Sequence, residues 1–223
     1  MISVIVPVFE GERFIGRCLR SLLHQTLNRD KYQIIVVDDG SRDRTSYALE
    51  LFKEDIKIIK NEKNLGLPKS LNIGITSSDS NFIVRVDSDD YVSTHFLEVL
   101  YEYLVQNELA GEYVDAVACD YLLIDDNEKT FSRKNCLIDP IGCGIMFRTH
   151  HYKEIGLYDE NFLRNEDKEL RVRFEKKFKI HRIKIPLYRY RRHRNNITND
   201  KEAMEHYSKK LKEKNKIKWM KFY

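Results

Sequence analysis

Short apolar runs alternate with amphipathic stretches along the first half of the chain. Runs typical of buried strands occur at residues 2–8 and 34–37, a third strand is expected at 56–59, and a further apolar run occupies 82–86. Apolar residues at helical spacing predict a helix after each of the first three runs, over 13–27, 44–52 and 67–75. Such alternation is typical of a doubly wound α/β fold. We therefore expect a mixed, mostly parallel central sheet flanked by helices, with a Rossmann-like first half.

The pattern loosens after a helix predicted over residues 95–107. The later elements are expected to be a return to the sheet at 114–121, a polar excursion or hairpin at 122–137, a helix at 166–177, a strand at 180–185 and a Tyr/Arg-rich stretch at 188–193. Because 223 residues suffice for one sizeable core and no linker is evident, we expect one domain over 1–199.

Cysteine usage and hydropathy bear on the compartment. The cysteines show no paired metal-ligand spacing: Cys18, Cys119, Cys136 and Cys143. No apolar leader precedes the first strand, and charged residues interrupt every apolar run before it is long enough to span a bilayer. We therefore expect reduced thiols in a cytoplasmic protein without a transmembrane anchor.

Positive charge is concentrated in the tail. Residues 201–223 contain eight lysines and three glutamates, a local charge of +5, so the rest of the chain carries −1 of the total of +4. The tail also contains apolar and aromatic residues: Tyr207, Leu211, Ile217, Trp219, Met220, Phe222 and Tyr223. Such a helix can lie on an anionic membrane surface at the inner face of the membrane, or it can dock on its own domain.

An acidic run, Asp87-Ser88-Asp89-Asp90, directly follows the apolar run 82–86. A strand that ends in carboxylates holds them at the edge of a sheet where open α/β folds bind ligands. A hard divalent cation would make such crowded carboxylates tolerable and would leave coordination positions for a substrate phosphate. The alternative is a solvated acidic turn in which Asp90 or Ser93 caps the next helix.

A second acidic turn, Asp38-Asp39-Gly40-Ser41, ends the run 34–37 and should open onto the same rim. An acid there can accept hydrogen bonds from a base N–H or a ribose hydroxyl. Ordinary turn chemistry, with Asp43 as a helix cap, explains the same residues. The chain has neither Gly-x-Gly-x-x-Gly nor a Gly-Lys-Ser/Thr loop, which argues against dinucleotide oxidoreductases and P-loop phosphotransferases.

A third acidic pair, Glu166 and Asp167, lies in the first turn of the helix predicted over 166–177. Acids at this position complement the helix dipole. A carboxylate held near the rim of a sheet can also accept a proton from an attacking hydroxyl as a general base. The sequence leaves both interpretations open.

Taken in order, these motifs resemble those of the family 2 inverting glycosyltransferases with the GT-A fold. The likeness covers about residues 1–196 and rests on Val6-Pro7-Val8-Phe9, Asp38-Asp39-Gly40-Ser41, Asn64-Leu65-Gly66 with Asn72-Ile73-Gly74, Asp87-Ser88-Asp89-Asp90, and Glu166-Asp167. It implies a nucleotide-sugar-binding half at 1–110, an acceptor half at 111–199 and a basic helix or tail at 200–223. It also implies a transferase that uses a nucleoside-diphosphate sugar with Mn²⁺ or Mg²⁺.

The resemblance carries roles to matching positions. The donor site would comprise Pro7, Phe9, Asp38, Asp39, Asp87 and Ser88. Asp89 would bind the metal that bridges both phosphates, with His193 as a further ligand. Asp167 would be the catalytic base, and further contacts to phosphate or acceptor are assigned to Lys69, Glu166 and Arg191. One departure is Glu10, which stands where relatives often carry Asn.

The resemblance implies metal-assisted single displacement onto a hydroxyl of a saccharide or lipid-linked acceptor, in surface polysaccharide synthesis, with UDP favoured over GDP. One alternative is a sugar nucleotidylyltransferase, which favours a Gly- and Arg-rich loop after its first strand. Another is a basic nucleic-acid-binding protein, but no recognition helix or RNA-binding motif is evident. We therefore expect no nucleic-acid partner.

Overall fold

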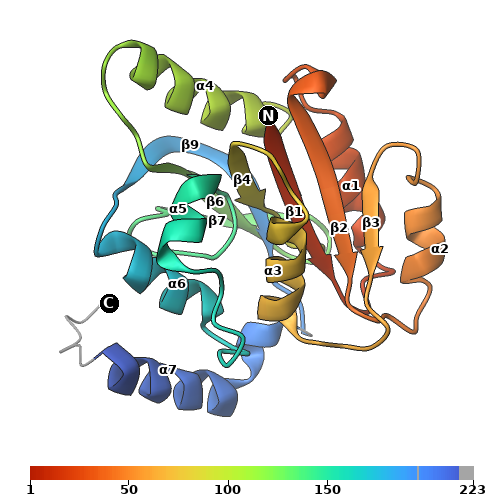
Figure 1. Ribbon diagram of the computed structural model, residues 1–223. Helices are drawn as coiled ribbons and strands as arrows, with labels where there is room; N and C mark the ends of the chain where they lie inside the picture. Colours follow the sequence, from red (N-terminus) through yellow and green to blue (C-terminus); the bar gives the residue numbers. More distant parts are fainter. Residues whose placement is uncertain (195, 216–223) are drawn as a thin grey trace.

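A single mixed sheet runs through the molecule in this computed structural model, which describes residues 1–194 and 196–215 (Figure 1). Its strands are β1 (Ile2–Val8), β2 (Tyr32–Asp38), β3 (Lys57–Lys60), β4 (Phe82–Arg85), β5 (Tyr91–Val92), β6 (Ala116–Ile124), β7 (Thr130–Lys134), β8 (Ile145–Arg148) and β9 (Ile180–Arg191). Within the described residues they follow the order β3-β2-β1-β4-β8-β6-β9-β5, and β7 pairs with β6.

The first half forms the predicted parallel sheet. Strand β1 pairs in parallel with β2 and β4, and β2 pairs in parallel with β3. Strand β1 extends to Val8, as the run 2–8 predicts, with Pro7 opposite Val37. The carboxyl ends of these parallel strands therefore lie at one edge, as a doubly wound fold requires.

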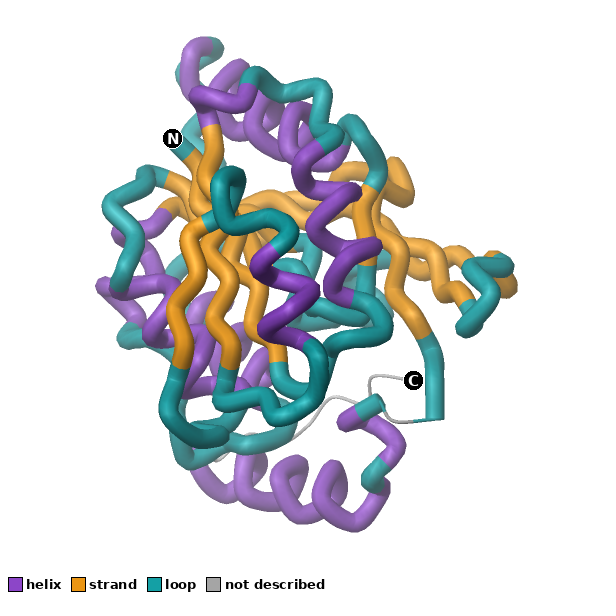
Figure 2. The backbone as a smooth tube through the Cα atoms, turned by 90° about the vertical axis from the view of Figure 1, so that its right-hand side faces the viewer, coloured by secondary structure: helices purple, strands orange, loops and turns teal. Residues whose placement is uncertain are grey.

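Helices cover both faces of the sheet (Figures 1 and 2). The side chains of α1 (Ile15–Leu23), α2 (Thr45–Glu50) and α4 (Phe96–Leu109) share one core cluster with β1 and β2. Those of α3 (Leu67–Thr76), α5 (Thr149–Ile155) and α6 (Glu166–Glu175) share a second cluster on the opposite face. The predicted α/β fold class is confirmed.

Several predicted boundaries differ from the structure. Helix α1 ends at Leu23 rather than near residue 27, because Gln25 and Thr26 leave the helix to bond Ser93 and Thr94. Residues 122–137 form the hairpin that was one of two alternatives, β6 with β7. Strand β9 continues through the Tyr/Arg-rich stretch. The sequence missed the two-residue strand β5, strand β8, helix α5 and the 3-10 turns Arg29–Lys31 and Ile197–Asn199.

The tail begins with α7 (Lys201–Asn215), which lies along the bottom of the molecule beneath α6 (Figure 1). Leu211 is 1% exposed, and the ring of Tyr207 lies 6.1 Å from that of Phe162. Lys214 contacts Asp159 at 2.5 Å and Glu169 at 2.9 Å. The structure thus favours the docked interpretation for this helix. The remaining apolar tail residues, from Ile217 to Tyr223, lie outside the described residues.

In the part of the chain that the structure describes, no helix combines the length and hydropathy needed to cross a membrane.

Candidate active site

Two acidic segments from different halves of the chain meet at the carboxyl edge of the parallel strands. The first is the acid loop, residues 87–90, which follows β4. The second is the first turn of α6, which carries Glu166 and Asp167. The side chain of Arg85, the last residue of β4, contacts carboxylates of both segments. The geometry therefore brings together two of the acidic motifs that the sequence singled out.

Arg85 binds Asp87 with two nitrogens and Glu166 with a third. Its Nε lies 2.6 Å from Asp87 Oδ1, its Nη2 3.2 Å from Asp87 Oδ2, and its Nη1 2.9 Å from Glu166 Oε1. Burial raises the pKa of Glu166 to about 7, although the charge of Arg85 opposes this shift. Burial likewise raises the pKa of Asp87. Arg85 lies within the apolar run 82–86 and was not predicted as a site residue.

Asp167 is the carboxylate that remains available for chemistry. Among the described residues, none forms a hydrogen bond or ion pair with it, and it is partly exposed beside a small cavity lined by Pro140, Ile141 and Lys168. A Cβ built on Gly142 would lie 2.7 Å from Asp167 Cβ. Gly142 therefore packs directly against the predicted base, a contact that the sequence did not signal.

The two predicted metal ligands lie side by side. His193 Nε2 is 2.9 Å from Asp89 Oδ2, and Asn196 Nδ2 is 3.5 Å from the same oxygen. Two donors bound to one cation at right angles, with bonds near 2.1 Å, are about 3 Å apart. The ring of Phe14 lies 5.1 Å from that of His193. Asp89 and His193 therefore fit a shared divalent cation, and the same spacing permits their direct hydrogen bond.

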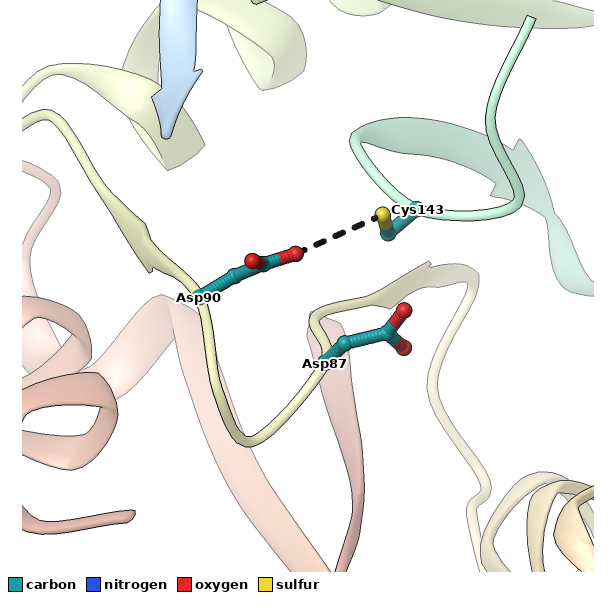
Figure 3. Close-up of side chains that lie close together, drawn as sticks. All are labelled: Asp87, Asp90 and Cys143. Atoms are coloured by element: carbon teal, nitrogen blue, oxygen red, sulfur yellow. Dashed lines mark hydrogen bonds between the residues drawn. The ribbon is translucent and has the colours of Figure 1, made fainter. Parts of the chain in front are cut away.

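The Asp90 carboxylate is hydrogen-bonded to groups of the protein itself. It is 2% exposed and accepts hydrogen bonds from Tyr188 Oη at 2.7 Å and from the Arg191 backbone N–H at 2.7 Å. Figure 3 shows its carboxylate pointing toward Cys143, whose Sγ lies 3.9 Å away, with Asp87 alongside. Burial raises the pKa of both Asp90 and the Cys143 thiol. Helix α4 begins at Phe96 with no side-chain cap, so Asp90 and Ser93 do not cap it.

The group Asp87, Asp90 and Cys143 could also hold a metal ion, because a ligand atom from each lies within 4.8 Å of the others. A hard cation prefers oxygen ligands, whereas this group includes a buried thiol that resists ionisation. The Asp89–His193 pair is therefore the better candidate for Mg²⁺ or Mn²⁺.

Asp38 ends β2 and Asp39 follows it, and both carboxylates accept hydrogen bonds from groups of the chain. Asp38 Oδ1 accepts from the Ser41 backbone N–H at 3.0 Å. Asp39 accepts from the backbone N–H groups of Leu65 and Gly66, both at 2.9 Å, and from Asn61 Nδ2 at 2.8 Å. The Asp38–Ser41 contact matches the turn-chemistry interpretation, but Asp43 is not the N-cap of α2, because Arg44 holds that position without a side-chain cap. Asp39 instead binds a segment 22 to 27 positions later and orders the loop before α3 at the rim of the sheet.

The remaining predicted donor residues lie at the same rim. Pro7 is the second-last residue of β1, and Phe9, two positions on, is 48% exposed. Ser88 lies within the acid loop, between Asp87 and Asp89.

The other predicted contacts have partners within the chain. Lys69 Nζ lies 3.0 Å from Glu160 Oε1. Arg191 is 2% exposed, and its Nε donates to the backbone carbonyl of Asp89 at 2.9 Å. Its remaining guanidinium nitrogens contact residues 125, 126 and 128 of the β6–β7 turn. Arg191 thus holds the backbone of the acid loop.

Comparison with known families identifies the class of protein. The chain matches the family model "Glycosyl transferase family 2" over residues 3–216. It therefore belongs to glycosyl transferase family 2, as its motifs suggested.

The chain covers less than half the length of each of two curated relatives. The chain is 36% identical over 133 residues to the uncharacterized glycosyltransferase EpsJ of Bacillus subtilis (strain 168), which covers 59% of this chain and 37% of that protein. It is 32% identical over 125 residues to the poly(ribitol-phosphate) beta-N-acetylglucosaminyltransferase TarS of Staphylococcus aureus (strain Mu50), covering 55% of this chain and 20% of that protein.

Solved structures share the fold. S. aureus TarS 1–349 in complex with UDP-GlcNAc superposes with a TM-score of 0.77 at 19% identity, covering 94% of this chain and 65% of that one. The mannosyltransferase PcManGT of Pyrobaculum calidifontis, in complex with GDP-Man and Mn²⁺, gives 0.75 at 15% identity, with coverage of 96% and 63%. At these identities the likeness shows the fold alone.

Proposed function

We propose that this chain is an inverting glycosyltransferase that moves a sugar from a nucleoside-diphosphate sugar to a hydroxyl of a saccharide or lipid-linked acceptor. The observation that carries the proposal is the meeting of the acid loop with the first turn of α6. Donor-side acids lie at one rim with Asp167, whose carboxylate has no partner among the described residues, as an in-line displacement needs.

Each residue has a role in this proposal. Pro7, Phe9, Asp38 and Asp39 border the nucleoside, and Asp87 and Ser88 approach the ribose or the sugar. Asp167 takes the proton of the acceptor hydroxyl as its oxygen forms the new bond to the anomeric carbon, while the bond to the diphosphate breaks. A single displacement of this kind inverts the configuration at that carbon.

Asp89 and His193 would hold a divalent cation. When bound, Mn²⁺ or Mg²⁺ would stabilise the negative charge on the departing diphosphate. The complex of PcManGT with GDP-Man and Mn²⁺ supports this choice by analogy. We assign Lys69 to contacts around the phosphates or acceptor, and Arg191 to support of Asp89. Glu166, predicted as a further contact, is buried and bound by Arg85, so we assign it to support of the first turn of α6.

The donor is proposed to carry UDP rather than GDP, because the TarS structures contain UDP and UDP-GlcNAc. Surface polysaccharide synthesis is proposed as the setting, because one relative is named for transfer to poly(ribitol-phosphate). A place in the cytoplasm at the inner face of the membrane is proposed from the sequence alone.

A donor screen tests the proposal. The purified chain is incubated with UDP- and GDP-sugars, Mn²⁺ and candidate acceptors, and released nucleoside diphosphate is measured. Asp167→Asn should lower turnover by about 10²- to 10⁴-fold while UDP binding persists, because a general base contributes that range. Glu175→Gln, at the exposed end of the same helix, is the matched control and should retain wild-type turnover.

Other outcomes would replace the proposal. Turnover at the wild-type rate in Asp167→Asn would remove the base assignment. Pyrophosphate released from a nucleoside triphosphate and a sugar phosphate would indicate a nucleotidylyltransferase. Tight, steeply salt-dependent binding of nucleic acid without turnover would indicate a nucleic-acid-binding protein.

A further inference from the structure

Arg85 is a charged side chain in a position of the fold that is otherwise apolar. It lies in β4, between β1 and β8 in the interior of the sheet, and only 7% of it is exposed. Alternation along the strand points Ile83 and Arg85 to the face that α6 covers, and Ile83 packs there in the core. A guanidinium in such a place is costly unless its N–H groups are bound.

The partners of Arg85 come from the two halves of the chain. Asp87 begins the acid loop, and Glu166 lies 81 positions after Arg85, in the first turn of α6. Asp167 follows Glu166 directly, so whatever fixes the Glu166 side chain also fixes the start of the helix that carries the base. Gly142 packs against the same assembly, since a Cβ there would lie 2.8 Å from Arg85 Nη1 and 2.7 Å from Asp167 Cβ.

Stability alone does not explain this arrangement. A buried ion pair is often no more stabilising than apolar residues of the same volume. A guanidinium does supply rigid geometry, because its planar fork can grip one carboxylate with two nitrogens and a second carboxylate with another. A lysine ammonium could not reproduce these three directions.

We propose that Arg85 is a positioning residue that couples the donor-side acid loop to α6 and so sets the distance between the donor and Asp167. This inference rests on the proposed function, because Asp167 must act as the base for its position to matter. Displacement of a reacting group by about 1 Å can cost roughly 100-fold in rate. Arg85→Lys should therefore lower kcat by about 100-fold and weaken UDP binding less.

The structure offers a matched control. Arg148 is also 7% exposed, ends the neighbouring strand β8, and pairs with Glu108 at 2.8 Å at the opposite end of the sheet. Arg148→Lys replaces an equally buried arginine, opposite the end of β4 that lies away from the acid loop, although its partner Glu108 is about half exposed. It should therefore test the loss of a buried guanidinium and leave kcat within about threefold of wild type. The comparison separates positioning from general loosening.

The test combines kinetics on Arg85→Lys, Arg148→Lys and Glu166→Gln with calorimetric binding of UDP and Mn²⁺. If Arg85 acts through Glu166, the effects on kcat are not additive, and the double variant Arg85→Lys/Glu166→Gln is no slower than Arg85→Lys alone. An additive loss, an equal loss in Arg148→Lys, or an unchanged kcat in Arg85→Lys would overturn the proposal.

Hydrogen exchange on the full-length chain provides a readout that needs no turnover. In Arg85→Lys, amides of the acid loop and of the first turn of α6 should lose protection together, and Arg148→Lys should leave both protected. Loosening of only one segment would refute the coupling. If the wild type turns over no nucleotide sugar and yet both segments loosen together, the transferase assignment fails while the coupling by Arg85 stands.

Discussion

Docking of α7 on the domain can be tested by a single substitution, Leu211→Ala. The Leu211 side chain is 1% exposed, while Lys209 on the same helix is exposed. Burying a leucine side chain contributes roughly 1.5–3 kcal/mol, and truncation to alanine in a core costs roughly 2–5 kcal/mol. Because α7 lies at the edge of the domain, we expect the lower part of that range, about 2–3 kcal/mol.

Urea denaturation of the full chain measures the loss directly, and Lys209→Ala is the control. Both variants place alanine in α7, so helix propensity nearly cancels between them. The control should stay within about 0.5 kcal/mol of wild type. In thermal unfolding, about 2–3 kcal/mol corresponds to a fall in Tm of roughly 4–12 °C for a chain of this length.

The contrary result has a definite meaning. If Leu211→Ala were as stable as Lys209→Ala, α7 would not be docked in solution, and its apolar residues would be free to meet an anionic membrane. The docked state predicts instead that Leu211→Ala increases binding to anionic vesicles relative to Lys209→Ala, because a weakened contact releases the helix.

Asp89, Gly142 and Asp159 can each be tested by a single substitution. Asp89→Ala should weaken Mn²⁺-dependent binding of UDP about tenfold or more by calorimetry, and unchanged binding would remove Asp89 as a ligand. Gly142→Ala should reduce turnover more than UDP affinity, because its Cβ would push Asp167; equal turnover would show that this contact relaxes freely. The pKa of Asp159 falls from 3.8 to about 2. Partial burial opposes this shift, but hydrogen bonds from Lys214 and Asn161 outweigh the effect of burial. Asp159→Asn should therefore lose up to about 2 kcal/mol at pH 7 in urea denaturation, and this difference from wild type should vanish as the pH falls from about 4 to 2; a difference independent of pH would refute the ion pair.

Strands β1, β2 and β4 were predictable because buried parallel strands are continuous apolar runs, whereas β3 is an edge strand whose residues are mostly exposed. Strand β8 was missed because its apolar part, Ile145 to Phe147, is shorter than the runs that distinguish strands from loops. The second half of β9 was described only as Tyr/Arg-rich, since its polar composition hides two buried side chains. Tyr188 is 0% exposed and Arg191 is 2% exposed, and both are buried against the acid loop.

The candidate base and metal ligands were predictable because acids that follow a strand or open a helix stand out in the sequence. The residues that hold the base and the metal ligands in place could not be found in the same way. Gly142 matters through close approach to Asp167 and Arg85, which only the folded chain creates. Glu10 has a φ of 52°, in the left-handed region where Asn is several-fold enriched, so the departure expected at this position lies at a strained backbone.

The acid loop also changes the argument for a metal ion. Crowded carboxylates suggested that a cation must neutralise them, yet the protein already supplies a partner for each outer acid. Arg85 binds Asp87 from one side, and Tyr188 with the Arg191 backbone N–H binds Asp90 from the other. Asp89 faces His193 alone among ionisable side chains of the described residues. Crowding of the carboxylates therefore does not itself demand a cation. Asp89 and His193 favour a divalent cation, because their spacing suits two ligands of one ion and both are partly open to a bound diphosphate.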